Sequence, residues 1–568
     1  MFNPNKQPKT DPPQEVIAKR FIKKLESESS LDFLAKVFSD LPELEMYLVG
    51  GIVRDTLIEH PTSKDYDFIA RNVPIEKLIK TLKKYGSVNL VGQNFGVLKF
   101  VPWDSTLEEP IDIALPRQDF SDNTGGYRDF QAQSDDNLPV EDDLSRRDLT
   151  INAIAYQLQT NQIIDPFNGQ QDLKDGIVRS VGKPEDRFQE DYSRMLRAIR
   201  FAGRFNFTIE NKTYASIKKL MPHINDERET TIVRSIERKL IMATSPTEKK
   251  KLQTKLDKQK AKNPNETMME RVVPMETIAK ELLKSFSENP TRALQLWDDS
   301  GAFEQILPEV LTMKNCEQPP EFHAEGDVWQ HTKLMIEKIN SPEFKAQFPN
   351  AKISGEFALS VLLHDIGKPP TKKTPEHDGS DRIRFNGHNT EGAKIARGIG
   401  NRLKLSTEQL AMLDFLITEH MFLMSTNDIS VISNNKIAKR FIDNPNSPEL
   451  LMLFYLDSLC SLRPDGTSPM KNFQETLKKI EEIKTIRANQ PISIINGKEI
   501  IDLLESKSGA LIGIVKQIIS ELSDKGEINN IDDAIEFVKK HKKLLLEYSD
   551  KIDKNSKDKA IEEIMKQI

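Results

Sequence analysis

Residues 48–68, LVGGIVRDTLIEHPTSKDYDF, constrain the fold of this chain more than any other segment. The apolar residues before the glycines predict a buried strand, and DYDFIA predicts a second one. Gly50 and Gly51 stand between the first strand and a helix. Glycines there let backbone N–H groups approach a phosphate, and the helix N-terminus adds positive potential. The segment therefore predicts a mixed α/β head with a phosphate-binding turn.

Three carboxylates are the candidate catalytic residues of this head. Asp65 and Asp67 lie at i and i+2 on the predicted strand, so both point to one face. Asp112, in PIDIAL, is on another short predicted strand and would complete a three-carboxylate cradle. Mg²⁺ prefers such oxygen ligands, and two ions would activate a hydroxyl and steady a leaving pyrophosphate. The alternative is an ordinary Asp-x-Asp pair at a strand end.

The next motif, SRRDLTINAIAY over residues 145–156, combines arginines with a polar pair. On the predicted helix Asp148 and Asn152 share a face, because they are four residues apart. Arg146 and Arg147 precede them, and the planar guanidinium donates two hydrogen bonds to a phosphate. The alternative is a helix with an ordinary basic start.

A third motif, FQEDYSRMLRAIRFAGRF over residues 188–205, places Asp191 three residues before Arg194. Cytosine and adenine both present an amino donor beside a ring-nitrogen acceptor. A carboxylate accepts from the first and a guanidinium donates to the second, so the pair would accept C and A and reject G and U. The alternative is an ion ladder that also includes Arg197 and Arg200.

In order and spacing these segments resemble class II template-independent nucleotidyltransferases of the polymerase-β superfamily. That family comprises CCA-adding tRNA nucleotidyltransferases and bacterial poly(A) polymerases. The matching motifs are GG-x-VRD-x-L…D-x-D, RRD-x-T-x-NA, DPFNGQQDLKDGIVRSVG and ED-x-x-R with LRAIRFA. The resemblance runs from residue 46 to about residue 210.

The resemblance implies transfer of CMP and AMP from CTP and ATP to the tRNA 3′ end, without a nucleic-acid template. It assigns the catalytic Mg²⁺ to Asp65 and Asp67, with Asp112 in the third-carboxylate position. It implies that Asp191 and Arg194 read the base, supported by Glu190. The implied nucleotide-binding residues are Gly50, Gly51, Arg54, Asp55, Arg147, Asp148, Asn152, Asp191, Arg194, Arg197 and Arg200.

Two segments bear on which family member this chain resembles. A later family motif appears only as METIAKELLK, with Thr277 where Arg is usual, and it is displaced by a Lys-rich insert at about 246–266. The loop between Pro116 and Ser145 is long and polar, as in enzymes that add all of CCA. Relatives that add only CC are expected to lack this loop.

A second candidate site consists of histidines and aspartates in the motifs DVWQHT, LLHDIGK, FNGHNTEG, TEHM and FYLDSL. Imidazole and carboxylate are good ligands for Mn²⁺, Fe²⁺, Co²⁺, Ni²⁺ or Zn²⁺, and an ion there would activate water for phosphoester hydrolysis. A single His is more often a packed structural residue. The candidate ligands are His331, His364, Asp365, His388, His420 and Asp457.

This order of ligands resembles the HD phosphohydrolase superfamily, and HAEGDVWQH over residues 323–331 is similar to the version appended to some class II nucleotidyltransferases. The resemblance implies a second divalent metal, and a domain that either hydrolyses phosphoesters or braces the tRNA. Lys368 is a candidate phosphate contact. We interpret the pair His377 and Asp378 as a decoy in a polar loop.

These features predict an α+β protein: a small mixed-sheet polymerase-β-like nucleotidyltransferase head, a long all-α neck, an HD body and a helical tail. After Ser145 the pattern is almost entirely helical. The predicted divisions are an N-terminal extension and helix at 1–45, the head at 46–165, the neck at 166–316, the HD domain at 317–465 and a tail at 466–568 that binds tRNA or only packs as a bundle.

Composition limits the remaining choices. Two cysteines, Cys316 and Cys460, exclude a disulfide framework and a Cys-based zinc site and indicate a reducing cytoplasm. We expect no secretory signal and no membrane span. The predicted partners are tRNA, CTP and ATP, with the oligomeric state left open. Poly(A) polymerase, an A-adding half-enzyme, and a metal phosphohydrolase with an RNA-binding head remain as alternatives.

Overall fold

The computed structural model describes residues 14–59, 65–91, 97–107, 109–121, 123–126, 130–243, 245–424, 429–489, 495–506, 509–549 and 557–568. The chain divides into two compact units. Unit 1 comprises residues 1–311, 353–358 and 399–405, and unit 2 comprises residues 312–352, 359–398 and 406–568. None of the described helices is both long and apolar enough to cross a bilayer. The predicted five-part division stays a prediction.

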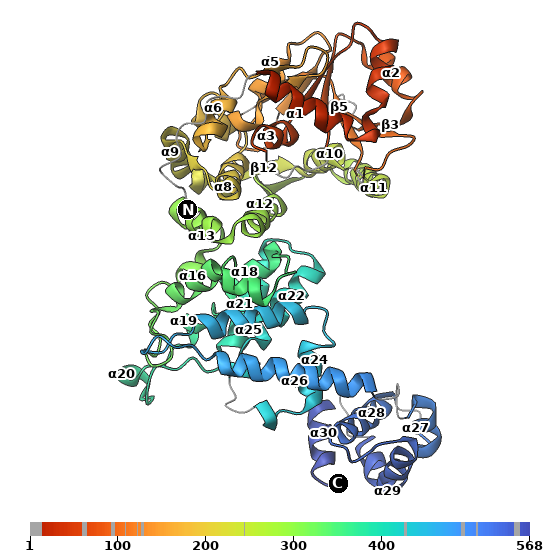
Figure 1. Cartoon of the computed structure of the whole chain (residues 1–568), viewed down its shortest axis with the longest axis vertical. Coiled ribbons are helices and arrows are strands. Elements are labelled where there is room, and N and C mark those ends of the chain that lie inside the picture. The colour runs from red at the N-terminus through yellow and green to blue at the C-terminus, as the bar shows by residue number, and fades with distance from the viewer. Residues whose placement is uncertain are drawn as a thin grey trace. The chain divides into compact units, whose positions relative to one another are not determined.

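A seven-stranded sheet forms the head within unit 1 (Figure 1). The strand order is β3–β4–β5–β2–β1–β8–β9, and β2 and β5 are the parallel pair in an otherwise antiparallel sheet. The central strands are apolar along nearly their whole length because both faces are covered. The strands are β1 (Glu45–Val49), β2 (Asp67–Arg71), β3 (Gly86–Val91), β4 (Val97–Pro102), β5 (Ile111–Ala114), β8 (Ala155–Gln157) and β9 (Gln162–Ile164).

Helices cover both faces of this sheet. Phe21 of α1 stacks on Tyr156 of β8, with ring centroids 4.2 Å apart. On the other face, Val140 and Leu144 of α5 pack with Tyr47 of β1 in one buried cluster. The helical part of the predicted N-terminal segment is divided, because a 3₁₀ turn at Ser29–Leu31 separates α1 from α2. The helices around the sheet are α1 (Gln14–Glu26), α2 (Phe33–Asp40), α3 (Gly51–Leu57), α4 (Ile75–Leu82) and α5 (Val140–Ser145).

The long polar loop expected before Ser145 contains a hairpin of β6 (Arg117–Ser121) and β7 (Phe130–Ser134), followed by α5. Beyond Ser145 most elements are helical, as predicted, but strands β8 and β9 join the edge of the sheet beside β1. These strands have three residues each. So short a strand shows no alternating pattern in the sequence, and pairing with β1 determines its conformation.

The neck is helical, apart from two short strand pairs, β10 (Ile177–Val178) with β11 (Thr208–Ile209) and β12 (Glu227–Thr231) with β13 (Thr267–Arg271). The Lys-rich insert contains a helix, α11. The helices of this region are α6 (Gly169–Asp175), α7 (Pro184–Glu190), α8 (Ser193–Phe205), α9 (Asn211–Leu220), α10 (Ile232–Met242), α11 (Pro246–Lys262), α12 (Met275–Glu288), α13 (Pro290–Asp299), α14 (Ala302–Ile306) and α15 (Pro308–Leu311).

Helix α8 is joined to α12 by a buried ion pair. Arg200 Nε donates to Glu281 Oε2 at 2.7 Å, and both side chains are almost fully buried. Glu281 belongs to METIAKELLK, the segment in which Thr277 replaces the usual Arg. The neck thus retains this carboxylate as an anchor for α8 despite the substitution.

The regular elements described in unit 2 are helices, apart from an isolated bridge between Lys373 and Arg384. A cluster of aliphatic side chains forms a separate core among its last four helices. The helices are α16 (Val328–Lys338), α17 (Pro342–Gln347), α18 (Gly355–Leu363), α19 (Lys368–Thr371), α20 (Pro375–Asp378), α21 (His388–Arg402), α22 (Thr407–Glu419), α23 (Met421–Met424), α24 (Asn434–Phe441), α25 (Ser447–Cys460), α26 (Met470–Asn489), α27 (Gly497–Leu504), α28 (Gly509–Asp524), α29 (Ile531–Ser549) and α30 (Lys557–Met565). Residues 355–358 of α18 and 399–402 of α21 belong to unit 1.

Candidate functional site

Two of the three predicted carboxylates lie side by side in the head. Asp67 of β2 is in register with Asp112 of the parallel strand β5. Asp65 lies just before β2, so the prediction that it belongs to the strand is wrong. Burial, reinforced by the charges of Asp112 and Asp65, raises the pKa of Asp67 to about 6. The three groups therefore form one cluster of negative charge, which a bound cation would stabilise.

The turn before α3 comes very close to this cluster. Gly50 has a φ of +81°, in the left-handed region that favours glycine. A Cβ atom there would lie 3.1 Å from Asp67 Oδ2 and 3.8 Å from Arg147 Nη1. A side chain would fill the space beside the carboxylates. The glycine leaves that space for a ligand, and the oxygen-only donor set fits a hard divalent cation.

Lys99 is a neighbour of this cluster that the sequence analysis missed. It lies opposite Asp112 on the antiparallel strand β4. Its Nζ is 2.7 Å from Asp112 Oδ1. The lysine offsets part of the negative charge of the cluster. No local motif indicates this contact, because it depends on the register of two strands.

The RRD motif forms a buried hydrogen-bond network rather than a helix face. α5 ends at Ser145 and residues 150–152 form a 3₁₀ turn, so the predicted α-helix is wrong. The expected pair still meets, because Asn152 Nδ2 donates to Asp148 Oδ1 at 3.2 Å. Arg197 Nε of α8 donates to Asp148 Oδ2 at 2.6 Å. Burial alone would raise the pKa of Asp148, but Arg197 holds it below the ordinary value.

Arg147 and Arg54 join this network from two sides. Arg147 Nη2 donates to the buried Asp143 at 3.2 Å. Arg54 Nη1 donates to Asn152 Oδ1 at 2.7 Å, and Arg54 Nε donates to its neighbour Asp55 at the same distance. Both Arg54 and Asp55 are buried. Arg147 Nη1 also donates to the backbone oxygen of Asn152 at 3.4 Å. The predicted residues Arg54, Asp55, Arg147, Asp148 and Asn152 are thus joined in one network.

The predicted base-reading pair lies where α7 gives way to α8. Arg194 Nε is 4.0 Å from Asp191 Oδ2, and Ser193 N donates to Asp191 Oδ1 at 2.9 Å. Burial raises the pKa of Asp191 above its ordinary value. Glu190 Oε2 accepts from Arg194 Nη1 at 2.7 Å and from Arg187 Nη1 at 2.8 Å. Glu190 therefore orients Arg194, as the prediction of a supporting role requires.

The second candidate site is in unit 2, where all six predicted ligands are buried. They divide into two groups, and within each group the candidate ligand atoms lie within 4.8 Å of one another. One group contains His331, His364 and Asp457, and the other contains Asp365, His388 and His420. The neighbours His364 and Asp365 follow α18 and contribute to different groups. His377 and Asp378 are exposed on α20 and belong to neither group, in agreement with their interpretation as a decoy.

The four histidines are all held through Nδ1, which leaves Nε2 facing the carboxylates. The backbone oxygens of Val361, Phe385 and Ile417 are 2.7–2.8 Å from the Nδ1 atoms of His364, His388 and His420. The Nε2 atoms of His388 and His420 are 3.3 Å apart. Imidazoles anchored through one nitrogen are typical metal ligands. The donor set fits a transition-metal ion.

Burial lowers the pKa of His388 to about 4, despite the nearby carboxylate of Asp365. Its imidazole is therefore neutral near pH 7 and available to a cation. Gly367, in the HDIGK motif, allows this arrangement. A Cβ atom on Gly367 would lie 2.0 Å from the carbonyl oxygen of His388. Only glycine lets α21 begin so close to the His-Asp pair.

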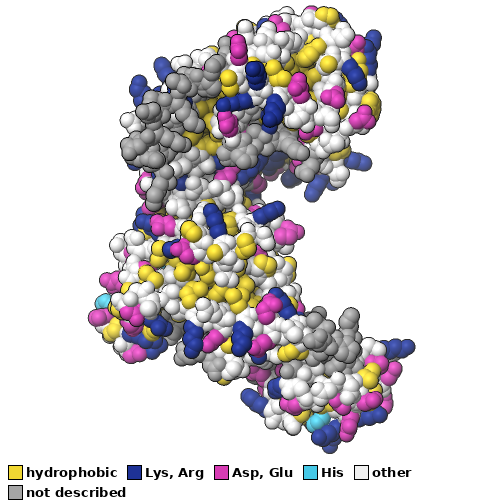
Figure 2. Space-filling view, viewed as in Figure 1, with side chains coloured by type: hydrophobic (Ala, Val, Ile, Leu, Met, Phe, Trp, Pro, Cys, Tyr) yellow, Lys and Arg dark blue, Asp and Glu magenta, His cyan; other side chains and the backbone are white. Residues whose placement is uncertain are grey.

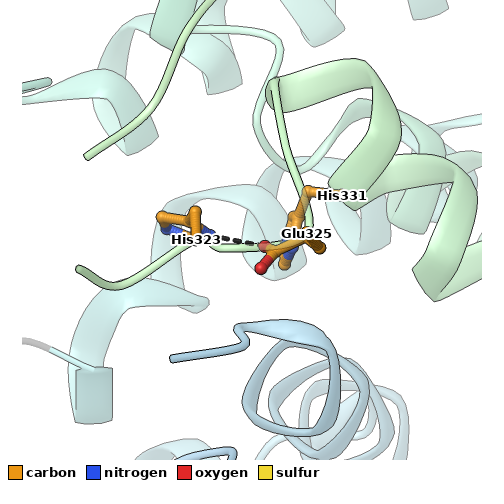
Figure 3. A group of neighbouring side chains, drawn as sticks. All are labelled: His323, Glu325 and His331. Atoms are coloured by element: carbon orange, nitrogen blue, oxygen red, sulfur yellow. Dashed lines mark hydrogen bonds and ion pairs between the residues drawn. The ribbon is translucent and has the colours of Figure 1, made fainter. Parts of the chain in front are cut away.

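Glu325 is a supporting residue that the sequence analysis did not single out. Its Oε1 lies 2.7 Å from Nδ1 of both His323 and His331, and Figure 3 shows the ring of His323 directed at this carboxylate. Its Oε2 accepts from Leu462 N at 2.9 Å. Glu325 thus fixes the orientation of His331. The signal was present in HAEGDVWQH, where it lies six residues before His331.

A pocket of about 830 Å³ opens onto this metal-ligand cluster. Asp365, His388 and Asp457 line its wall. Lys368 also lines it, and its Nζ is 2.7 Å from Asp365 Oδ2. The other cationic lining residues are Arg382, Arg384, Arg440 and Arg463. A metal-ligand cluster beside several cations suits a phosphate ester.

Comparison with known proteins adds two domain families. A family model described as the poly A polymerase head domain matches residues 46–179. A model described as the HD domain matches residues 350–462. The first contains the carboxylate cluster and the RRD motif. The second contains five of the six predicted ligands of unit 2, with His331 outside it.

Curated relatives match over most of both chains. The multifunctional CCA protein of Actinobacillus pleuropneumoniae serotype 5b is 31% identical over 382 residues, which is 66% of this chain and 75% of that protein. The multifunctional CCA protein of Nitrosospira multiformis is 29% identical over 367 residues, covering 64% of this chain and 70% of that protein.

Solved structures share the fold. The Bacillus stearothermophilus CCA-adding enzyme in complex with CTP has a TM-score of 0.56 at 16% identity, over 92% of this chain and 99% of that chain. The Thermotoga maritima CCA-adding enzyme complexed with tRNA has a TM-score of 0.50 at 19% identity, over 92% and 97% of the two chains. At these identities the likeness concerns the fold.

Proposed function

This chain belongs to the family of multifunctional CCA proteins, and on that premise we propose that it adds CCA to the 3′ end of tRNA. The tRNA 3′-hydroxyl would attack the α-phosphate of CTP twice and then that of ATP, releasing pyrophosphate each time. The observation that carries the proposal is the carboxylate cluster of Asp65, Asp67 and Asp112 beside Gly50. The similarity to curated relatives of this family, which extends over most of the chain, supports the same proposal.

We assign Mg²⁺ to this cluster, held by Asp65 and Asp67 with Asp112 in support. Bound Mg²⁺ supplies charge stabilisation to the reacting phosphate and makes the attacking hydroxyl more acidic. The chain's own residues do the positioning. The Gly50 turn would admit the phosphates. The guanidinium of Arg147 lies beside this turn, because a Cβ atom on Gly50 would be 3.8 Å from Arg147 Nη1.

The remaining predicted nucleotide contacts have unequal support. Asp148 and Asn152 form one rigid network with Arg197 and Arg54, which suits binding of a ribose. Arg200 is engaged with Glu281 in the neck, so its proposed part is to hold α8 in place. We also propose that Gly51, Asp55 and Arg197 belong to the nucleotide-binding site.

We assign base selection to Asp191 and Arg194. The carboxylate would accept from the amino group that cytosine and adenine share, and the guanidinium would donate to the adjacent ring nitrogen. Glu190 supports this assignment because it holds Arg194 by a hydrogen bond of 2.7 Å. Guanine and uracil present the opposite pattern at those positions and would leave both groups unpaired.

Product lengths test the proposal directly. The protein is incubated with Mg²⁺, CTP and ATP and with three tRNAs, which end before CCA, after C and after CC. Termination at CCA from all three is the expected result. Long A tails would indicate a poly(A) polymerase, and addition of A only to the CC-ending tRNA would indicate a half-enzyme. Absence of any extension would overturn the proposal.

A second activity, hydrolysis of phosphate esters, is favoured by the ligand groups of unit 2. Each group has three buried candidate ligands, and the two groups share no residue, so we propose that the domain holds up to two divalent ions, one more than the sequence analysis expected. Bound ions would supply a water of lowered pKa. Lys368 and the arginines of the pocket would bind the phosphate.

This activity is tested by release of phosphate from a phosphomonoester and from a 2′,3′-cyclic nucleotide. Mn²⁺, Co²⁺, Ni²⁺ or Zn²⁺ is supplied in turn. Metal-dependent turnover is expected, and no turnover with any of these ions would contradict the proposal. The substitution Asp67→Ala should leave this hydrolysis intact, because Asp67 is in the other unit.

The two cysteines support the predicted cytoplasmic setting. Cys316 and Cys460 are buried free thiols. Burial raises the pKa of Cys460 above its ordinary value, so this thiol is unreactive. Free thiols of this kind persist in a reducing compartment.

A further inference from the structure

Residues 232–266 form an arm that is inserted between the two strands of a hairpin in the neck. Strands β12 and β13 are antiparallel neighbours, and Thr231, the last residue of β12, lies opposite Thr267, the first residue of β13. The chain between these two residues forms α10 and α11, and Figure 1 shows both helices extending to the side of α12. Two residues suffice to connect a pair of antiparallel strands. The helices are therefore an addition that the hairpin does not need.

The arm is fastened by buried polar contacts. Glu270 of β13 accepts from Ser235 Oγ at 2.8 Å and from Arg238 Nη1 at 3.0 Å. Ser235 and Arg238 belong to α10 and are both buried. On α11, Leu256 is only 5% exposed and packs towards α10. These contacts hold the two helices on the strands.

A lysine face runs along α11. Lys251, Lys255, Lys258 and Lys262 are spaced i, i+4, i+7 and i+11, so they share one side of the helix over about 16 Å. All four are exposed. Within the part of the chain that the structure describes, the first three form no ion pair, and Lys262 Nζ is 4.0 Å from Glu266 Oε2. Figure 2 shows Lys and Arg side chains at this edge of unit 1.

This charge is costly for the helix that bears it. Like charges at i, i+4, such as Lys251 with Lys255, destabilise an isolated helix. Of the two acidic residues of α11, Glu248 lies beside the stripe in the first turn, three residues before Lys251, and Asp257 lies away from it and is engaged with Gln253. Seven lysines against these two acids give α11 a formal charge of +5, on a chain whose net charge is −6. A densely negative partner would remove the repulsion.

The base of the arm adds to this surface. A pocket of about 410 Å³ is lined by Arg228, Arg234 and Arg238. The exposed side of α11 has no large apolar residue that would enter a lipid bilayer. Both observations favour nucleic-acid phosphates as the partner.

We propose that the lysine face of α11 binds the phosphate backbone of the tRNA substrate, at a surface separate from the transfer site. The inference rests on the proposed function, because that function supplies the tRNA. Each phosphate neutralised by a lysine releases counterions. The arm thus raises the affinity for tRNA and takes no part in the chemical step.

The test compares three full-length variants with the unaltered protein. In one, Lys251, Lys255, Lys258 and Lys262 are all replaced by Gln. In the matched control the same four are replaced by Arg, which keeps the charge. In the third, residues 232–266 are replaced by Asn-Gly, because the facing pair Thr231 and Thr267 fits a two-residue turn. The dissociation constant for tRNA is measured from 50 to 200 mM salt, together with KM and kcat.

For the Gln variant and the deletion we expect a higher KM for tRNA and an unchanged kcat at saturating tRNA. The slope of log Kd against log salt should fall by about 3. The Arg variant should behave like the unaltered protein. Unchanged affinity and slope in both the Gln variant and the deletion would overturn the inference. Binding of each variant to poly-glutamate is measured as well. If the Gln variant loses that binding while its tRNA affinity is unchanged, the inference is overturned and the lysine face has an acidic protein partner. If the unaltered protein extends no tRNA, the proposed function fails instead.

Discussion

Asp67 and Asp112 face each other from the parallel strands β2 and β5, although they are far apart in the sequence. Burial, together with the nearby charge of Asp112, raises the pKa of Asp67 to about 6. Two carboxylates in such a position repel each other without a cation. This relationship is the structural basis of the proposed transfer site, and the Gly50 turn leaves space beside it.

Replacement of Asp67 by Asn should abolish nucleotide transfer. The substitution removes one charged ligand of the proposed metal site, so we expect kcat to fall by about three orders of magnitude or more. Asp104→Asn, at an exposed position in the same unit, is the matched control. Labelled CMP incorporation into tRNA is the readout. Near-normal incorporation by a folded Asp67→Asn variant would remove this residue from the site.

Replacement of Arg194 by Ala should weaken base selection more than overall binding. The lost guanidinium contact corresponds to about 1–3 kcal/mol of discrimination between bases. Incorporation of GMP and UMP relative to CMP should therefore rise by about 5- to 150-fold. Arg292→Ala in α13 serves as a control, because Arg292 donates to Gln295 and has no part in the proposed pair. If the ratio of wrong to right bases does not change, Asp191 and Arg194 are not the template.

The two units should lose activity independently. Asp365→Ala should abolish phosphoester hydrolysis and lower the content of bound metal, because Asp365 faces both His388 and His420. CCA addition should continue. His377→Ala, on exposed α20, should change neither activity. Metal analysis of the purified variants separates loss of the ion from loss of catalysis, and a fully active Asp365→Ala variant would refute the proposed ligand set.

Glu325→Gln should weaken metal binding without removing a ligand. Glu325 orients His331 through Nδ1, and loss of such a support costs about 10–100-fold in metal affinity. Titration with Co²⁺, followed by its absorption spectrum, measures the change. Glu317→Gln, at an exposed position of the same unit, should have no effect. Equal affinity in both variants would show that the carboxylate does not position His331.

Asp143 should make the stability of the head depend on pH. Burial opposes its charge, but Arg146 and Arg147 hold the pKa of Asp143 below the ordinary value. A lowered pKa stabilises the folded state above the unfolded pKa of about 3.9, and this contribution is lost as the pH falls towards the folded pKa. Asp143→Asn should therefore cost about 3 kcal/mol at pH 7 and less near pH 3. Urea unfolding of both proteins at the two pH values measures the difference, and an equal difference at both would contradict the account.

The local motifs predicted much of the candidate sites. The strand–turn–helix around Gly50, the strands of Asp67 and Asp112, and the six buried candidate ligands of unit 2 all follow from short segments with strong patterns. Contacts that depend on long-range register could not be found in this way. Lys99 reaches Asp112 only because β4 lies against β5.

Other features were missed for local reasons. The RRD segment has the apolar spacing of a helix, but its side chains make hydrogen bonds that replace the helical ones, and Asp148 bonds to the next backbone N–H. The division of six ligands between two groups was also not visible. His364 and Asp365 are neighbours in sequence, yet the end of α18 turns them towards different partners. Only the packing of α16, α21 and α25 around them determines which partners they meet.

The most direct test of the central claim is to sequence the 3′ ends of a tRNA that lacks CCA after incubation with the protein, Mg²⁺ and all four nucleoside triphosphates. The carboxylate cluster and the Asp191–Arg194 pair predict that nearly every extended molecule ends in CCA and that extension stops there. Ends of varied sequence, or uninterrupted runs of A, would contradict this account of the chain.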